Sequence, residues 1–427
     1  MARTPPERTP PGRTPHGRTP HEGHGPVRYG PPAPEPGLPV PDGLAEVLAA
    51  ASRRFAGEPP GGGPALREAA AGYWRRRGLA AGPDGVVAAP GPQPLLFALL
   101  GAYGGAGAHG RGDVLLPRPS PAWWTPQARL LGRPAYRVPT PAECGGVPDP
   151  YALLETVRRV RAEGGAPALL LLSVADDPTA TVPPPEILRE ACEAAVGEGL
   201  HIISDETWRD TLHRPGGTTL ISPAEMCPDD VTVIADLAGA LLPSAWPAAV
   251  ARFPPTAAGA ALRAGTLDLL TALGANVAEP VAAAAAHALA EPAPVTAHRE
   301  RAVALHARVG AAAHRAVLAS GALARPPAAG RHLYADLGPL RRGLAARGVG
   351  DSMELEEYLT GRLGTPVPGG HRFGDELGAL RVRLSTAPLL GATAELRAEA
   401  LASPDPLALP QVADALTLLA TALGELR

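Results

Sequence analysis

The sequence contains no lysine: its 39 basic residues, in a chain of 427, are all arginine. A lysine amine is the side-chain group that forms Schiff bases with carbonyl compounds, so chemistry of that kind has no group to start from. Cysteine is almost as scarce. The three cysteines, Cys144, Cys192 and Cys227, are widely spaced and form no CxxC pair. This excludes a disulfide framework and favours a reduced, cytoplasmic compartment.

Two further absences exclude whole classes of partner. The formal net charge is −3, so no basic field attracts nucleic acid and we expect no nucleic-acid partner. No segment reaches the roughly 18 uninterrupted apolar residues that a membrane span needs. Residues 237–251 come nearest, but Pro243 and Pro247 interrupt them. The N-terminus lacks the apolar run of a secretory signal, so we expect neither a membrane span nor secretion.

Residues 1–40 are rich in proline and poor in apolar side chains. The triplet Arg-Thr-Pro recurs with a strict period of five, beginning at Arg3, Arg8, Arg13 and Arg18. Proline removes backbone donors, and a stretch with so little apolar surface cannot build a core. We predict that this segment is a disordered tail whose histidines (His16, His21 and His24) are solvated rather than metal ligands.

From residue 41 the pattern alternates between helices and strands. Apolar runs bounded by turn residues predict strands at 86–89, 114–116, 135–138, 168–174, 200–204 and 231–235. Helical spacing predicts helices at 44–55, 65–77, 92–103, 150–162 and 186–196. This alternation indicates parallel βαβ units in a layered α/β sheet. After residue 254 we predict a long helix (295–320) and then a smaller α+β unit, with strands at 332–337, 365–368 and 380–385 and helices at 353–362 and 410–426.

Four turns follow strands of the larger predicted sheet: Pro90–Gln93, Ser173–Asp177, Asp205–Trp208 and Asp236–Gly239. In open α/β sheets, ligands bind outside the carboxyl ends of the strands. We therefore expect one cleft lined by these four turns. The histidines spaced by eight along the helix at 295–320 have no acidic or cysteine partners in a ligand pattern, so no metal site is predicted.

Six stretches resemble, in their order, segments of the class I and II aminotransferases, the fold-type I enzymes that use pyridoxal phosphate (PLP). They are GPALREAAAGYWRRRGL from Gly63, VVAAPGPQPLLFAL from Val86, DVLLPRPSPAWW from Asp113, DPTATV from Asp177, IISDETWRD from Ile202 and GTPVPGGHRFGDELGALRVRLST from Gly364. The resemblance covers residues 41–427. It implies a large domain (65–290) with a mostly parallel sheet flanked by helices, a smaller α+β C-terminal domain (291–427), an arm (41–64) that packs with the small domain, and a homodimer.

The resemblance implies three retained features of the site. Asp205 matches the aspartate that faces the pyridine nitrogen of the cofactor, where a carboxylate keeps the ring protonated. Gly91 and Gln93 match the turn whose backbone N–H groups and helix N-terminus meet the phosphate. Arg383 matches the arginine that grips the substrate carboxylate with a bidentate fork.

Three departures remove attachments of the cofactor. Gly239 falls at the Schiff-base lysine, so neither a covalent link nor the usual general base is available. Pro247 falls at the arginine that binds the phosphate, and proline offers neither charge nor a backbone donor. Phe55 falls at the tyrosine that reaches the phosphate in the partner subunit.

Further departures lie around the cofactor ring. Asp177 replaces an asparagine, and Trp208 a tyrosine, that donate to the ring's phenolic oxygen. An ionised aspartate is acceptor-only and would repel that oxygen. An aromatic side chain normally stacks on the ring where Pro121 falls here, and Trp123 or Trp124 substitutes for it only by a shift along the chain.

We therefore expect a family member that keeps the fold but does not transaminate. Its cleft would bind a carboxylate-bearing small molecule through Arg383, with Trp123, Trp124 and Trp208 as apolar walls. It would act as a sensor, as a protein partner, or in a PLP-independent reaction. The acid–base candidates for such a reaction are Asp177, Asp205 and His371.

The alternative is an enzyme of amino-acid metabolism that holds PLP, or its aminated form PMP, noncovalently. Its base would come from His201, His213, His371 or a carboxylate, and no histidine lies beside Gly239 in the sequence. The absence of lysine argues against an ordinary transaminase. Some regulators fuse this fold to a helix-turn-helix, but residues 1–40 are too rich in proline to form one.

Overall fold

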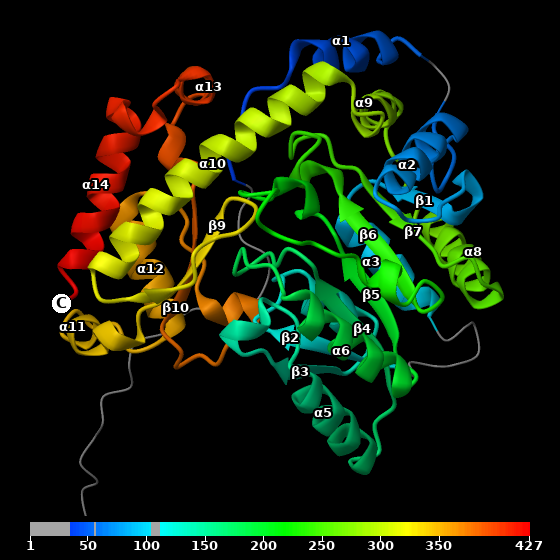
Figure 1. The fold of residues 1–427 in the computed structure, drawn as a ribbon, viewed down its shortest axis with the longest axis horizontal. Coiled ribbons are helices and arrows are strands. Elements are labelled where there is room, and N and C mark those ends of the chain that lie inside the picture. Colours follow the sequence, from blue (N-terminus) through cyan, green and yellow to red (C-terminus); the bar gives the residue numbers. More distant parts are fainter. Residues whose placement is uncertain (1–34, 55–56, 104–111) are drawn as a thin grey trace, which may run out of the picture.

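The computed structural model describes residues 35–54, 57–103 and 112–427 (Figure 1). Residues 1–34 of the predicted tail and Phe55 lie outside the described residues. The last six residues of the predicted tail, 35–40, are described. They run without regular secondary structure to the first helix, α1 (Asp42–Ala51).

In the described residues, seven strands form the larger sheet, in the order β1-β7-β6-β5-β4-β2-β3. Strands β2 to β6 pair in parallel, whereas β7 lies antiparallel between β6 and β1. The sheet is therefore mostly parallel, as predicted. Its strands are β1 (Val86–Ala89), β2 (Asp113–Arg118), β3 (Ala135–Pro139), β4 (Pro167–Ser173), β5 (His201–Asp205), β6 (Val231–Asp236) and β7 (Ala249–Arg252).

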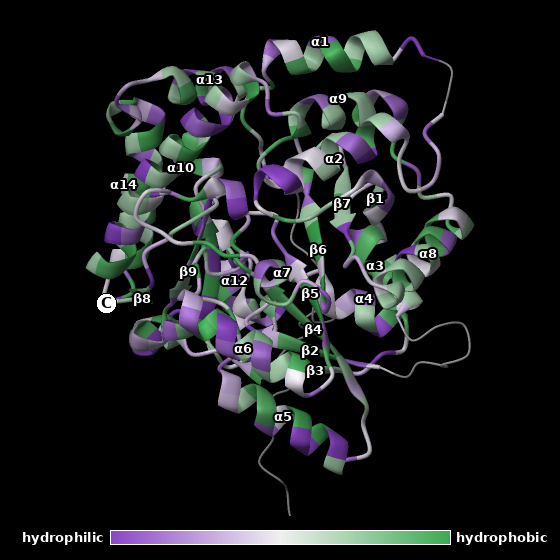
Figure 2. Cartoon of the chain, turned by 45° about the vertical axis from the view of Figure 1, so that its right-hand side comes forward, coloured by the Kyte–Doolittle hydropathy of each residue, from purple (hydrophilic) through white to green (hydrophobic). Residues whose placement is uncertain are grey.

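The central strands have both faces buried, because successive side chains point to opposite faces and helices cover both. In β4, Leu170 and Leu172 pack into one core, and Leu169 and Leu171 into the other. Figure 2 shows the hydrophobic colouring along β6 beneath the helices. The helices that contribute to the first core are α2 (Pro64–Arg76), α5 (Pro150–Ala162), α6 (Pro185–Gly197), α7 (Pro223–Met226) and α9 (Glu279–Leu289). Those that contribute to the second core are α3 (Pro92–Ala102), α4 (Trp124–Leu130) and α8 (Ala257–Ala272).

A smaller unit follows, built on an antiparallel sheet in the order β10-β9-β8. Leu333 of β9 and Val382 of β10 pack against Val317, near the end of the long helix α10. Figure 1 shows α10 running from the side of α1 and α9 to this sheet. The elements are α10 (Ala293–Ala319), β8 (Leu323–Ala324), β9 (His332–Asp336), α11 (Arg341–Ala345), α12 (Ser352–Leu363), β10 (Arg381–Ser385), α13 (Ala394–Ala402) and α14 (Pro410–Gly424).

One feature of the smaller unit differs from the prediction. The strand predicted at 365–368 is wrong: two of these residues are prolines, which cannot donate to a ladder, and only Gly369 forms an isolated bridge, to Val382.

Helix α1 lies within the arm expected at 41–64. It packs on α9, and its Leu44 belongs to the core of the larger unit.

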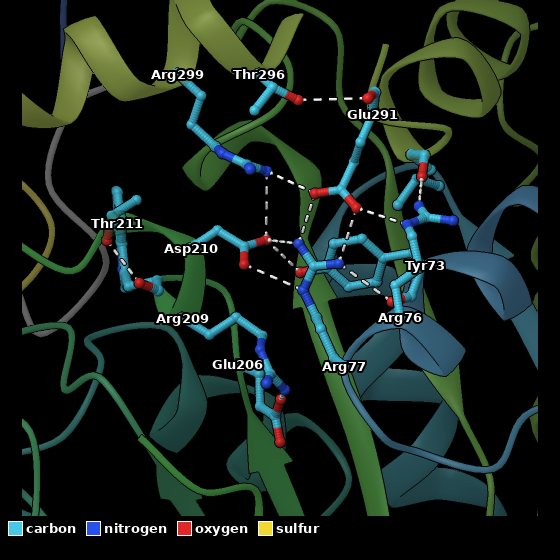
Figure 3. Close-up of polar contacts among 12 residues, drawn as sticks. Tyr73, Arg76, Arg77, Glu206, Arg209, Asp210, Thr211, Glu291, Thr296 and Arg299 are labelled. Atoms are coloured by element: carbon cyan, nitrogen blue, oxygen red, sulfur yellow. Dashed lines mark hydrogen bonds and ion pairs between the residues drawn. The ribbon is translucent and has the colours of Figure 1, made fainter. Parts of the chain in front are cut away.

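A partly buried ion network holds the turn that follows β5 (Figure 3). Arg77, just after α2, donates from Nη2 to Oδ2 of Asp210 and Oε1 of Glu291, both at 2.7 Å. The hydroxyl of Tyr73 donates to the same Asp210 oxygen at 2.7 Å, and Arg299 of α10 donates to Glu291 at 2.9 Å. The network joins α2, the turn after β5 and the junction of α9 with α10, so it fixes a turn that lines the site described below.

The three cysteines are free. None of the helices within the described ranges is both long enough and apolar enough to cross a membrane.

Candidate functional site

The four predicted turns meet at one cavity of about 190 Å³ at the carboxyl ends of the strands of the larger sheet. Each of the four turns contributes to its wall, which confirms the prediction of a shared cleft. The smaller unit and residue 35 close the other side. The lining residues are Glu35, Pro92, Gln93, Ala122, Trp123, Asp177, Asp205, Thr207, Trp208, Asp236, Arg331, His332 and Arg383.

Asp205, the last residue of β5, lies in this wall and is 4% exposed. Its Oδ1 accepts hydrogen bonds from the backbone N–H (3.0 Å) and the hydroxyl (2.6 Å) of Thr207. Burial raises the pKa of Asp205 to about 7, although the two hydrogen bonds from Thr207 act to lower it. Near neutral pH this carboxyl group is therefore divided between its neutral and ionised forms.

Thr207 links the ends of two neighbouring strands. While its hydroxyl donates to Asp205, the same oxygen accepts from the backbone N–H of Asp236 at 3.0 Å. Asp236 ends β6, and its Oδ1 accepts from the N–H of Ala238 at 3.0 Å. Burial raises the pKa of Asp236 to about 6. The strand ends thus present two carboxyl groups with raised pKa values to one cavity, Asp205 buried and Asp236 half-buried.

Arg383, in β10, lies opposite these strand ends. Its Nη1 is 3.1 and 3.2 Å from the two carboxylate oxygens of Asp177. Burial alone would raise the pKa of Asp177, but Arg383 and His332 lower it, so Asp177 is ionised at neutral pH. The predicted substrate arginine therefore lies in the cavity with a carboxylate of the chain already on it.

A second carboxylate, that of Glu35, lies on the same side of the cavity. It is 3.0 Å from Nε of Arg331, 3.2 Å from Nε2 of His332 and 3.7 Å from Nη2 of Arg383, and it accepts from the hydroxyl of Ser385 at 2.8 Å. Burial alone would raise the pKa of Glu35, but His332, Arg331 and Arg383 hold it well below its usual range. Sequence analysis missed this group, because it placed Glu35 in a disordered tail.

The tryptophans divide between the cavity and the core. Trp208 lines the cavity, with its ring edge-on to His332 at 5.5 Å and the guanidinium of Arg331 5.3 Å from its centre. Trp123 also lines the cavity. Trp124 was predicted as a wall but is buried in the core beside α3. It begins helix α4, where successive side chains point about 100° apart, so Trp123 faces the cavity while Trp124 faces the core.

The histidines proposed as bases lie outside the cavity. His201 begins β5, so it lies at the opposite edge of the sheet from Asp205, and burial lowers its pKa to about 4. His213 contacts two backbone carbonyls near β9. His371 lies in the smaller unit, 3.0 Å from a serine hydroxyl of α12. His332 is the histidine in the cavity wall, and sequence analysis passed over it because a lone histidine at the start of a strand resembles a core residue.

Gly239 ends the short 3-10 turn that follows β6. A Cβ atom built on it would lie 2.5 Å from Cγ2 and 2.9 Å from the carbonyl oxygen of Thr207. Both distances are well inside van der Waals contact. The residue at the expected lysine position is therefore a glycine with no room for a side chain.

The turn expected to meet a phosphate contains Gly91, the N-cap of α3, with a φ of 109°. A Cβ built there would lie 3.7 Å from Cβ of Pro247. The ring of Pro247 thus lies beside this turn, and it supplies neither a charge nor a donor. Pro92 and Gln93 of the same turn line the cavity.

These residues do not fit PLP as fold-type I enzymes hold it. Gly239 offers no amine and no space for one, and Pro247 provides no cation at the phosphate turn. Asp177, which would face the phenolic oxygen, is an ionised acceptor bound to Arg383. Asp205, Gln93 and Arg383 lie in the cavity wall, but they do not replace these lost contacts.

The family of aminotransferase class I and II matches the sequence over residues 36–234. A probable aspartate/prephenate aminotransferase of Thermus aquaticus is 30% identical over 219 residues, which are 50% of this chain and 53% of that protein. The 4-dedimethylamino-4-oxo-anhydrotetracycline transaminase of Streptomyces rimosus is 39% identical over 116 residues, 27% of this chain and 31% of that protein. The chain spans about half the length, or less, of these curated relatives.

Solved structures resemble the fold over most of the chain. An aspartate aminotransferase of Thermus thermophilus with maleate has a TM-score of 0.71 at 24% identity and covers 86% of this chain and 88% of its own. An aromatic aminotransferase of Pyrococcus horikoshii has a TM-score of 0.70 at 19% identity, and the match covers 87% of this chain and 93% of that one. The chain has the fold of the fold-type I enzymes, and its residues 36–234 are similar to the class I and II aminotransferases.

Proposed function

We propose that this protein does not transaminate and that its cavity binds a small molecule through a carboxylate group. One observation carries the proposal: Arg383 and Arg331 face one cavity, and each already contacts a carboxylate of the chain. Two arginines and a histidine on one wall form a site suited to carboxylates. Trp123 and Trp208 supply apolar surface for the rest of the ligand.

The loss of transamination follows from the missing amine. The sequence has no lysine, and Thr207 fills the space beside Gly239. Transamination also needs a base that moves a proton at the substrate. His332 is the histidine in the wall of the cavity, and its Nε2 lies 3.2 Å from Glu35, so it is engaged within the chain.

Isothermal titration with maleate, a small dicarboxylate, tests the binding proposal. We expect binding by the parent protein and at least tenfold weaker binding by Arg383→Met, because a lost hydrogen bond to a charged group costs about 1.5–3 kcal/mol. Arg315→Met, on an exposed part of α10, is the matched control and should bind as the parent does. Equal affinities of all three proteins for maleate would refute the proposal. Absence of binding both by the parent and by a variant in which Glu35, the carboxylate already in the cavity, is replaced by glutamine would also refute it.

Titration with PLP and then PMP tests the alternative. We expect no visible absorbance from a covalently held cofactor and no adduct fixed by borohydride. Submillimolar binding of PMP that Asp205→Ala abolishes would instead favour an enzyme with a noncovalent cofactor. Asp205 favours this alternative, because it matches the aspartate that faces the pyridine nitrogen and is buried in the cavity wall at the end of β5.

The homodimer and the cytoplasmic location expected from the sequence belong to the same proposal. Sedimentation at micromolar concentration tests the first, and a monomer would contradict it. Fractionation of the producing cells tests the second.

A further inference from the structure

Residues 35–41, here called the strap, cross from the cavity to α1. Glu35 lies at the cavity end. The backbone carbonyl of Gly37 accepts from Nε of Arg397 at 2.8 Å. Leu38 packs on the small core between α10 and α14, and Val40 packs on the core of the larger unit. Anchors on both units therefore hold the strap, and Glu35 is the residue that it places in the cavity.

The carboxylate of Glu35 makes the contacts that a bound ligand would make. Arg331 and His332 approach it from the start of β9, Ser385 donates to it from the end of β10, and Arg383 lies 3.7 Å away. Donors from two adjacent strands converge on one carboxylate. Arg331 and Ser385 are not among the site residues implied by the family resemblance.

Charge and space prevent Glu35 and an external carboxylate from occupying this place together. The wall already carries the carboxylate of Asp177 and the carboxyl groups of Asp205 and Asp236. A second anion among Arg331, His332 and Ser385 would face Glu35 within a few ångströms, and like charges at such distances in a buried site repel strongly. One carboxylate must leave before another enters.

We propose that Arg331, His332 and Ser385 form a carboxylate-binding subsite and that Glu35 is its resident internal ligand, which an external carboxylate displaces. This inference rests on the proposed function, because the incoming ligand is the carboxylate compound that Arg383 helps to bind. The strap is then a built-in competitor. The apparent affinity for ligand equals the intrinsic affinity scaled by the fraction of molecules in which Glu35 has left.

Maleate titration of Glu35→Gln tests the competition, since glutamine keeps the shape of the side chain and removes its charge. If Glu35 occupies the subsite in more than about nine-tenths of the molecules, the variant binds maleate at least tenfold more tightly. Glu46→Gln, at an exposed position of α1, is the matched control and should bind as the parent does. Arg331→Met in the Glu35→Gln background should abolish most of the gain.

The outcomes separate the two proposals. A parent that binds maleate and a Glu35→Gln variant that binds no more tightly would overturn the internal ligand and leave the proposed function standing. Absence of binding by the parent and by Glu35→Gln would overturn both. Binding by the variant alone would support both.

Nuclear magnetic resonance of the parent protein gives an independent readout. Saturating maleate should shift the amide resonances of Gly37, Leu38 and Val40, because the strap loses its anchor in the cavity. Unchanged resonances at these amides under saturating maleate would show that the ligand binds without displacing Glu35, and would overturn the inference.

Discussion

The contact between Gly239 and Thr207 predicts that even the smallest side chain at position 239 destabilises the protein. Gly239→Ala would place a Cβ 2.5 Å from Cγ2 and 2.9 Å from the carbonyl oxygen of Thr207. Carbon atoms in contact lie about 3.5–4.0 Å apart, so Thr207 would have to move by about 1 Å. Its hydroxyl is held by Asp205 and by the N–H of Asp236. We expect overpacking to lower the free energy of unfolding by about 1–3 kcal/mol.

Urea denaturation followed by circular dichroism measures this change. Gly361→Ala is the control, because it lies inside helix α12 and a Cβ there meets nothing within 4 Å. It should stabilise the protein by about 0.5–1 kcal/mol. Thr207→Ser removes Cγ2 and keeps the hydroxyl, so combining it with Gly239→Ala should recover part of the loss. A Gly239→Ala protein within about 0.5 kcal/mol of the parent, with no coupling to Thr207→Ser, would refute the packing argument.

Two further predictions concern buried charge. The pKa of Asp205 is about 7 in the folded protein, above the ordinary value of 3.8. The folded state therefore binds this proton more tightly, and its stability falls as pH rises from 4 to 7. Asp205→Asn keeps the oxygen that accepts from Thr207 but does not titrate. The free energy of unfolding of this variant, relative to that of the parent, should therefore increase from pH 4 to 7 and stay constant above pH 7. A difference between the two proteins that does not change with pH would contradict this. Arg77→Met should lower the free energy of unfolding by about 3 kcal/mol in urea denaturation, because Asp210 and Glu291 lose a partly buried partner. Arg75→Met, whose ion pair is exposed, should cost no more than about 0.5 kcal/mol, and equal losses would argue against the network.

The larger sheet was predictable because each of its predicted strands is marked in the sequence by a local apolar run bounded by turn residues. Runs such as Leu169–Leu172 are apolar on both faces, and the turns after these strands contain the polar residues that line the cavity. The same local signal could not separate Trp123 from Trp124, since adjacent residues differ only in the direction that the helix gives them.

Contacts between distant parts of the chain were not predictable. Glu35 meets His332 and Ser385 across 297 and 350 residues, and nothing within a proline-rich stretch indicates such partners. The packing of Thr207 against Gly239 is likewise invisible in the sequence, although the glycine itself and the missing lysine are plain there.

Thr207, whose hydroxyl joins the ends of β5 and β6, also limits which side chains position 239 tolerates. A side chain at position 239 meets both Cγ2 and the carbonyl oxygen of Thr207, and serine at position 207 would relieve only the first of these contacts. Gly239→Lys alone would therefore give a destabilised protein. A side chain at position 239 is tolerated better when Thr207→Ser is already present, so the packing of this pair disfavours an amine here independently of the other departures from the cofactor site.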